Sequence, residues 1–184
     1  MKEQCIFAGF GGQGMLLIGK FLAEAGMESG KHVSWLPSYG PEMRGGTANC
    51  NVKISDEEIA SPYCDQLDIL FTLNDAAIDK FESQLRPGGL LLVNSDLARP
   101  DRVYRDDIVV VKVPANETAA EIGNTRGTNI VMLGAMSEAS PYFDKDYMRG
   151  AIDHYFAKKG KVNAKNAVCF DRGAEIAAEQ LKKG

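Results

Sequence analysis

Apolar runs alternate with stripes of apolar residues at helical spacing along the N-terminal part of the chain. The first apolar run covers residues 4–8 and leads into a cluster of glycines. Beyond the glycines, apolar residues recur every three or four positions, as on one face of a helix. They are Met15, Leu16, Ile18, Phe21, Leu22 and Ala25. We predict a strand, a tight turn and a helix that ends at Gly30, followed by a second strand over residues 32–36.

Residues 47–54 alternate between apolar and polar side chains, which is the pattern of a strand with one buried face. The apolar set is Ala48, Cys50, Val52 and Ile54. The polar set, which points to the other side, is Thr47, Asn49, Asn51 and Lys53. The alternation therefore places Cys50 in the core and not in a reactive site.

The middle of the chain continues this succession of elements. Residues 68–73 form a nearly continuous apolar strand, and Asn74 or Asp75 can cap a helix that follows it as far as residue 85. Residues 86–89, Arg-Pro-Gly-Gly, predict a turn before another strand over residues 90–93. A β-branched strand over residues 107–113 ends at a proline.

The last third of the chain is mostly helical. Thr128 is expected to cap a helix that ends near Ala139, and Asp144 opens another helix towards Phe156. A final amphipathic stripe consists of Ala167, Phe170, Ala174, Ala177 and Leu181. Strands that alternate with helices indicate the α/β class, here a three-layer, Rossmann-like domain with a mostly parallel sheet. No shift in composition or internal repeat divides residues 1–184, so we expect a single domain.

Composition and charge exclude several functional classes. The formal net charge of -4 is spread without a basic stripe, which argues against nucleic-acid binding. The longest apolar runs fall far short of the roughly 20 residues that span a bilayer. Lys2 and Glu3 precede only a short apolar run, unlike a signal peptide. We expect a cytoplasmic protein without membrane contact.

Cysteine and histidine are too sparse and too scattered for an obvious metal site. The four cysteines are Cys5, Cys50, Cys64 and Cys169, and no two of them have CxxC spacing. The chain has only two histidines. Because structural zinc sites and iron-sulfur clusters need several ligands, usually in close pairs, we expect no metal in this chain and reduced thiols.

Gly9, Gly11 and Gly14 satisfy the GxGxxG pattern after a predicted strand and at the start of a helix. Such glycines allow a tight turn, and the helix N-terminus attracts an anion. A dinucleotide site also needs an acidic residue at the end of the second strand, but that strand ends in Trp-Leu-Pro-Ser over residues 35–38. NAD or FAD binding is therefore disfavoured, and a packing turn or a contact with an anion or partner remains open.

A second glycine-rich motif covers residues 38–47, Ser-Tyr-Gly-Pro-Glu-Met-Arg-Gly-Gly-Thr. It follows the carboxyl end of a predicted strand, the edge at which open α/β sheets bind ligands. Arg44 offers a guanidinium group for a carboxylate or phosphate. In a parallel sheet whose first two strands are neighbours, the two glycine-rich segments would lie side by side. Residues 123–127, Gly-Asn-Thr-Arg-Gly, form a loop before a helix. A simple connection is the favoured interpretation, and help in binding an anion remains open.

Together the two motifs resemble those of the gamma subunits of 2-oxoacid:ferredoxin oxidoreductases. In length and motifs the chain is most similar to the gamma subunit of the 2-oxoglutarate enzymes, and the resemblance covers essentially the whole chain. It implies a multisubunit oxidoreductase that decarboxylates a 2-oxoacid, here 2-oxoglutarate, with coenzyme A to acyl-CoA, carbon dioxide and reduced ferredoxin.

The resemblance also implies a division of labour between subunits. Thiamine diphosphate, magnesium and iron-sulfur clusters are expected in partner alpha, beta and, where present, delta subunits, and the isolated chain is expected to be inactive. We assign no catalytic residue and no metal ligand to this chain. The candidates for contact with an anion, coenzyme A or a partner are Gly9, Gly11, Gly12, Gln13, Gly14, Ser38, Tyr39, Gly40, Pro41, Arg44, Gly45 and Gly46. The alternatives are a free-standing, nucleotide-binding Rossmann-like reductase and a non-catalytic assembly module.

Overall fold

The computed structural model describes residues 2–38 and 47–183, which contain a sheet of six strands in the order β2-β3-β1-β4-β5-β6. The strands are β1 (Lys2–Phe10), β2 (His32–Ser38), β3 (Thr47–Ser55), β4 (Leu67–Thr72), β5 (Leu85–Asn94) and β6 (Val109–Val113). Strands β1, β4, β5 and β6 pair in parallel, whereas β3 runs antiparallel to both β1 and β2. The predicted α/β class with a mostly parallel sheet is confirmed.

The first two strands are not neighbours, because β3 lies between them. The prediction that they pair directly is therefore wrong. Only residues 39–46 connect β2 to β3. A connection of this length returns the chain antiparallel beside β2, since a parallel crossover needs about a dozen residues or more. Strands β1 and β2 nevertheless run in the same direction, so their carboxyl ends remain at the same edge of the sheet.

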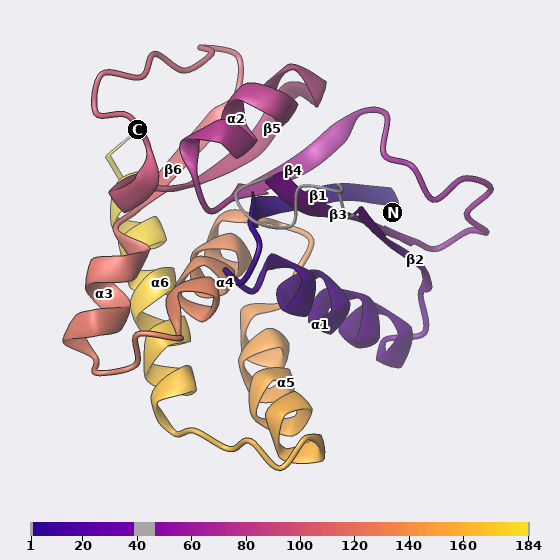
Figure 1. The fold of residues 1–184 in the computed structure, drawn as a ribbon. Coiled ribbons are helices and arrows are strands. Elements are labelled where there is room, and N and C mark those ends of the chain that lie inside the picture. Colours follow the sequence, from indigo (N-terminus) through magenta and orange to yellow (C-terminus); the bar gives the residue numbers. More distant parts are fainter. Residues whose placement is uncertain (1, 39–46, 184) are drawn as a thin grey trace.

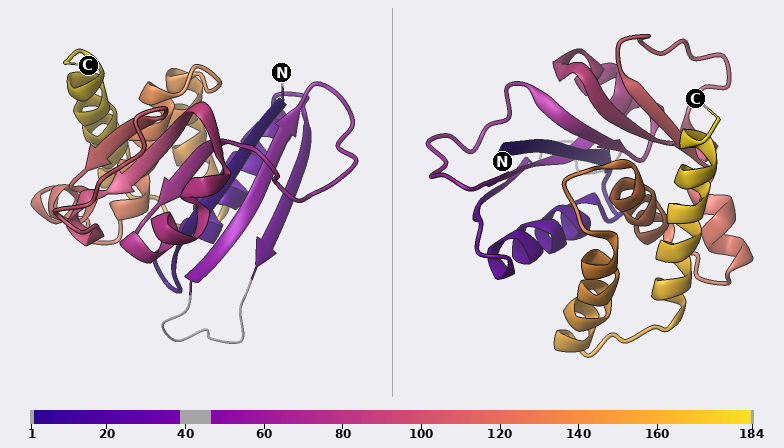
Figure 2. Two further views of the ribbon diagram at one scale, coloured as in Figure 1. Left: turned by 90° about the horizontal axis from the view of Figure 1, so that it is seen from above. Right: turned by 180° about the vertical axis from the view of Figure 1, so that it is seen from behind.

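Helices cover the two faces of the sheet unequally (Figures 1 and 2). They are α1 (Met15–Glu28), α2 (Asp75–Phe81), α3 (Ala115–Glu121), α4 (Thr128–Ala139), α5 (Lys145–Lys158) and α6 (Lys165–Leu181), with short 3-10 helices η1 (Glu82–Gln84) and η2 (Ser95–Leu97). One hydrophobic core joins the sheet to α1, α4, α5 and α6 around Phe7, Phe71 and Phe170. A smaller core joins the other face to α2 around Leu70 and Ile78. None of the described helices is long and apolar enough to cross a membrane.

Two predicted boundaries differ from the structure for local reasons. Asn74 caps α2 as expected, with its side chain accepting from the N–H of Ala77 at 2.9 Å, but the α-helix gives way to η1 after Phe81. Residues 86–89 belong to β5 and do not form a separate turn. The register moves from Leu67 opposite Leu85 to the next pair at Leu90, so the glycine-rich segment is an irregularity inside a strand.

Both sides of β3 are buried, although the alternation predicted only one buried face. Cys50 lies in the core with no exposed surface, as predicted. The opposite side chains of Asn49 and Lys53 are only 5% and 4% exposed. Residues 56–66 fold back over this side of the sheet, where the N–H of Cys64 donates to Asn51 Oδ1 at 3.0 Å. Periodicity cannot show such a cover, because it is made by a segment without regular structure.

Candidate functional site

The carboxyl ends of the paired strands β1 and β4 lie at the point in the sheet where successive connections leave towards opposite faces. Helix α1 leaves β1 towards one face, and α2 leaves β4 towards the other. Open α/β sheets bind ligands in the crevice at such a point. The first glycine motif occupies it: Gly9 is still in β1, and Gly11 and Gly12 are exposed. Gly12 and Gly14 have φ angles of 90° and 83°, a left-handed conformation that favours glycine.

Gln13 closes the crevice with its own side chain. Its Oε1 accepts from the N–H of Phe10 at 2.6 Å and from Asn74 Nδ2 at 3.2 Å, and its Nε2 donates to the carbonyl of Leu73 at 3.4 Å. A Cβ atom at Gly9 would lie 2.6 Å from Gln13 Oε1, so the first glycine makes room for this amide. The Gln13 amide therefore ties the glycine turn to the end of β4, and its contact with an anion stays a prediction.

A pocket of about 460 Å³ lies beside the closed crevice. Its described lining residues are Gly12, Gln13, Gly14, Asn116, Thr125, Arg126, Thr128 and Asn129. One wall is thus the predicted glycine motif, and the other comes from the connection before α4 and the first turn of α4. The sequence left anion binding by residues 123–127 open but favoured a simple connection, so Arg126 was not among the candidate site residues.

The charge distribution around this pocket favours an anion. Gly14, the residue directly before α1, and the first turn of α4 contribute to its wall, and neither helix has a side-chain N-cap or an acidic residue in its first turn. Their free N–H groups carry partial positive charge. Arg126 is exposed and adds a full charge, and none of the described lining residues is acidic. Converging helix N-termini and an arginine are the groups that bind phosphates and carboxylates.

Asn129 connects the two walls of the pocket. Its Nδ2 donates to the carbonyl of Gly14 at 3.4 Å, which joins α4 to the turn before α1. A Cβ atom at Gly14 would lie 2.3 Å from this nitrogen, so the asparagine requires a glycine there. Asn129 Oδ1 is buried and has no hydrogen-bond partner among the described residues. The pocket wall therefore retains one acceptor that the described part of the chain does not satisfy.

The second glycine-rich motif lies mostly outside the described residues. Tyr39, Gly40, Pro41, Arg44, Gly45 and Gly46 are in this group. Ser38 is described: it is exposed at the end of β2 and pairs with Asn49 of β3. Thr47, at the start of β3, pairs with Phe10 beside the glycine turn. The described ends of the second motif therefore lie at the same sheet edge as the first, on the side that faces the viewer in Figure 1.

The cysteines of the described chain are not arranged for metal or thiolate chemistry. No group of three or more His, Cys, Asp or Glu side chains among the described residues is placed to hold a metal ion. Burial raises the pKa of Cys50 to about 12 and that of Cys64 to about 11, and it also raises the pKa of Cys5 well above its usual range. These thiols stay protonated at neutral pH, whereas a metal ligand or nucleophile is a thiolate. That the whole chain carries no metal stays a prediction.

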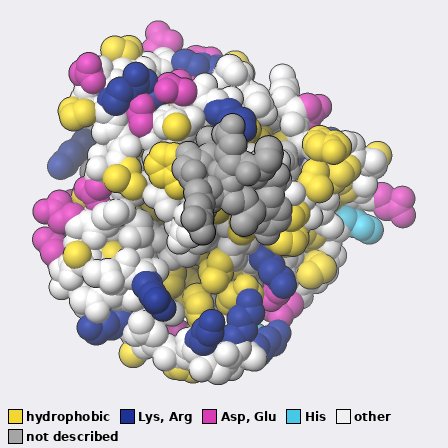
Figure 3. Space-filling model, viewed as in Figure 1, with side chains coloured by type: hydrophobic (Ala, Val, Ile, Leu, Met, Phe, Trp, Pro, Cys, Tyr) yellow, Lys and Arg dark blue, Asp and Glu magenta, His cyan; other side chains and the backbone are white. Residues whose placement is uncertain are grey.

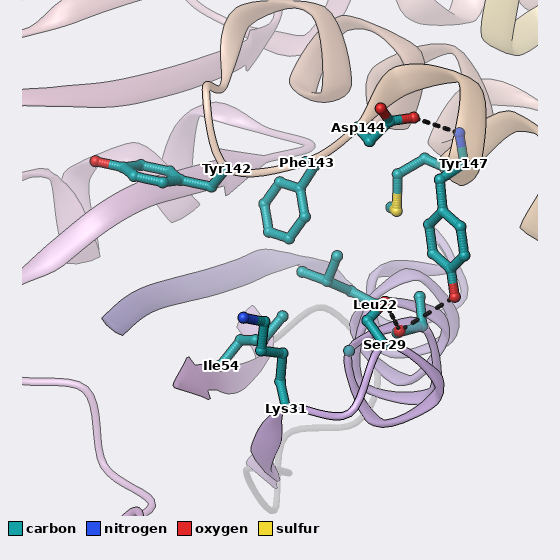
Figure 4. Close-up of a pocket in the computed structure, with 11 residues that line it drawn as sticks. Leu22, Ser29, Lys31, Ile54, Tyr142, Phe143, Asp144 and Tyr147 are labelled. Atoms are coloured by element: carbon teal, nitrogen blue, oxygen red, sulfur yellow. Dashed lines mark hydrogen bonds between the residues drawn. The ribbon is translucent and has the colours of Figure 1, made fainter. Parts of the chain in front are cut away.

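A second cavity, of about 190 Å³, lies at the opposite edge of the sheet, between the end of α1 and the start of α5 (Figure 4). Its polar groups are used within the chain. Tyr147 donates its hydroxyl to the carbonyl of Ala25 at 3.3 Å, Ser29 Oγ donates to the same carbonyl at 2.9 Å, and Lys31 pairs with Asp56. Since it offers no uncapped helix N-terminus or unpaired cation, it suits an anion less well than the pocket around Arg126.

Comparison with known proteins agrees with the resemblance in the motifs. The profile of the family described as pyruvate ferredoxin/flavodoxin oxidoreductase matches residues 4–176. The ketoisovalerate oxidoreductase subunit VorA of Methanothermobacter marburgensis is 40% identical over 95% of this chain, and the chain spans only 36% of that relative's length. The 2-oxoglutarate synthase subunit KorC of Methanocaldococcus jannaschii is 36% identical, with 97% of this chain and 96% of the relative covered.

Solved structures agree with these relatives. The 2-oxoglutarate:ferredoxin oxidoreductase of Magnetococcus marinus, solved with 2-oxoglutarate, coenzyme A and succinyl-CoA, superimposes with a TM-score of 0.85 at 26% identity. The match covers 97% of this chain and 31% of that one. The gamma subunit of a keto/oxoacid ferredoxin oxidoreductase from Geobacter sulfurreducens gives a TM-score of 0.77 at 32% identity, covering 96% and 99% of the two chains. The chain belongs to the pyruvate ferredoxin/flavodoxin oxidoreductase family.

Proposed function

We propose that this chain is the gamma subunit of a multisubunit 2-oxoacid:ferredoxin oxidoreductase, with 2-oxoglutarate as the oxoacid. The family assignment supports the oxidoreductase. The KorC relative of M. jannaschii, a 2-oxoglutarate synthase subunit that is 36% identical to this chain over almost the full length of both, supports the substrate. The reaction consumes the oxoacid and coenzyme A and yields succinyl-CoA, carbon dioxide and reduced ferredoxin.

The chain's own part in this reaction is to hold an anionic group in the pocket around Arg126. The observation that carries this proposal is the meeting of two helix N-termini without side-chain caps, those of α1 and α4, at a pocket whose described lining residues include no acid. Coenzyme A supplies phosphates of the required charge, and the pocket is large enough for one of them. Arg126 would neutralise the phosphate, while N–H groups of the first helical turns donate to its oxygens.

The redox chemistry is assigned to partner subunits. Thiamine diphosphate, magnesium and iron-sulfur clusters would reside in alpha, beta and, where present, delta subunits, with ferredoxin as the external acceptor. The face at the carboxyl edge of β1 and β2 supports a role in assembly. Figure 3 shows several patches of hydrophobic side chains on this face, with many of the charged side chains farther out. Phe10 at the end of β1 is 38% exposed. Exposed apolar patches rimmed by polar residues are typical of a subunit interface.

The test is a steady-state analysis of the assembled enzyme with Arg126→Ala. We expect the KM for coenzyme A to rise about tenfold or more, as for loss of one charge-assisted contact, with little change in the KM for the oxoacid. Arg172→Ala is the matched control, because Arg172 is exposed on α6 and, within residues 2–38 and 47–183, forms an ion pair only with Glu175. An unchanged KM for coenzyme A in the Arg126 variant would contradict the phosphate site.

A free-standing reductase makes a different prediction for the chain alone. The strand that would present an acidic residue to a dinucleotide ribose ends at Ser38. We therefore expect equilibrium dialysis of the isolated chain to detect no binding of NAD or FAD. Stoichiometric binding of either would favour the reductase over the subunit.

A further inference from the structure

A side-chain amide lies at the carboxyl end of each of the four parallel strands. These strands, β1, β4, β5 and β6, are neighbours in the sheet, so their carboxyl ends share one edge. Each amide lies within three positions of the end of its strand. In the order of the strands, the amides are those of Gln13, Asn74, Asn94 and Asn116. Residues that are far apart in sequence therefore form a row along the edge that carries the pocket around Arg126.

Backbone groups fix the orientation of the first two amides. Asn74 Oδ1 accepts from the N–H of Ala77, so the Asn74 Nδ2 is the group that donates to Gln13 Oε1. Gln13 Oε1 also accepts from the N–H of Phe10, so the Gln13 Nε2 is the group that donates to the carbonyl of Leu73. Turning either amide over would place a donor against a donor, because the nitrogen of an amide side chain cannot accept.

The same reasoning fixes the orientation of Asn116. Asn94 is buried, and its Oδ1 accepts from the N–H of Ala115 at 3.3 Å. Its Nδ2 therefore donates to the carbonyl of Leu73 at 3.4 Å and to Asn116 Oδ1 at 2.9 Å. Since the oxygen of Asn116 receives this bond, its Nδ2 remains as a donor. This nitrogen makes no hydrogen bond with another residue in the ranges 2–38 and 47–183.

Asn116 is exposed and lines the pocket around Arg126, on a wall that belongs neither to the glycine turn nor to α4. Its backbone is already occupied, because Asp96 Oδ2 accepts from the N–H groups of Asn116 and Glu117 at 2.7 and 2.9 Å. The side-chain nitrogen is therefore the group that this wall can offer to an anion. A phosphate has several acceptor oxygens, so donors on different walls of one pocket can bind it together.

We propose that Asn116 is a further binding residue of this pocket, which donates a side-chain N–H to a phosphate oxygen of coenzyme A. Asn94 is the positioning residue, because its own fixed amide makes Asn116 present a donor and not an acceptor. The inference rests on the proposed function, which assigns a coenzyme A phosphate to the pocket around Arg126. It deepens that function by naming a neutral, oriented donor on a separate wall of the pocket.

The first test is the Asn116→Asp variant in the assembled enzyme. The substitution keeps the oxygen that accepts from Asn94, but it replaces the donor with a negatively charged oxygen. We expect the KM for coenzyme A to rise at least about tenfold, with little change in the KM for the oxoacid. Asn163→Asp is the matched control, because Asn163 is exposed and its Oδ1 accepts from the N–H of Lys165, as an aspartate also can.

A purely structural role for Asn116, as the acceptor for Asn94, predicts an unchanged KM for coenzyme A in the Asp variant, and that result would overturn the inference. Asn116→Ala removes the donor without adding a charge and should give a smaller rise. It decides the question if the Asp variant does not fold, since an unchanged KM would again count against Asn116. If Arg126→Ala raises this KM and neither Asn116 variant does, only the present inference fails. An unchanged KM in all three variants would contradict the proposed function as well.

The second test is a double-mutant cycle of Asn94→Ala and Asn116→Ala, again with the KM for coenzyme A as the readout. If Asn94 acts by orienting Asn116, its loss should raise the KM while Asn116 is present and change it little once Asn116 is replaced. Asn94→Ser, which keeps an oxygen for the N–H of Ala115, takes the place of Asn94→Ala if that variant does not fold. Additive effects on the KM would contradict the positioning role, because a merely structural Asn94 would act independently of Asn116.

Discussion

At the candidate site, the roles of two side chains, those of Gln13 and Arg126, follow from their surroundings in the fold and not from their residue types. Gln13 has an amide that could bind a ligand, yet it bonds to Phe10, Leu73 and Asn74 of its own chain. Arg126, in a loop for which the sequence favoured a simple connection over anion binding, lines the pocket. A motif shows which side chains are present, but only the fold shows which of them already have hydrogen-bond partners within the chain.

Glu3 gives a prediction at this scale. Its side chain is buried on β1, and its pKa is raised from 4.5 to about 8, mainly by burial and then by the nearby charge of Asp68. Between these two values the folded state keeps a proton that the unfolded state has lost. Stability should therefore fall as the pH rises through this window, by at most about 1.4 kcal/mol per pH unit.

Glu3→Gln removes this titratable group, so the free energy of unfolding of the variant should depend less on pH than that of the unmodified protein. We expect urea unfolding of the two proteins to give free energies of unfolding that diverge from pH 5 to pH 8, with the variant the more stable at pH 8. Parallel pH profiles would show that Glu3 ionises in the folded state much as it does in the unfolded chain.

At the scale of elements, helices α4 and α6 pack with their backbones in direct contact. A Cβ atom at Gly134 would lie 1.9 Å from the carbonyl oxygen of Phe170, and one at Gly173 would lie 1.8 Å from that of Val131. The two backbones therefore touch through reciprocal glycines. This contact fixes α4, and with it the first turn that forms part of the pocket around Arg126.

Gly134→Ala or Gly173→Ala should separate the two helices. Because the obstacle is backbone and not a flexible side chain, we expect a loss of about 3 kcal/mol or more, at the upper end of overpacking effects. Gly150→Ala on α5 is the control, since nothing lies within 4 Å of its added Cβ. It should stabilise the protein slightly through helix propensity. Calorimetric melting temperatures that are equal in all three variants would contradict the close approach.

At the scale of the whole molecule, hydrophobic periodicity was sufficient for the class of fold and for most strands and helices. It did not predict that β3 inserts between β1 and β2, because pairing partners depend on connection length and not on the pattern within a strand. It also placed Asn49 and Lys53 on an open face, since the cover comes from residues 56–66. The glycine turn could be predicted at the site, whereas the wall from residues 125–129 required two helices distant in sequence to meet.

The central claim is that this chain completes a 2-oxoacid:ferredoxin oxidoreductase without performing the redox chemistry itself. The most direct measurement is ferredoxin reduction by the partner subunits, purified without this chain, before and after it is added. We predict that activity with 2-oxoglutarate and coenzyme A appears only after addition, saturates at a fixed stoichiometry, and is absent from the chain alone. Full activity of the partners without the chain, or no stable complex with it, would contradict the account.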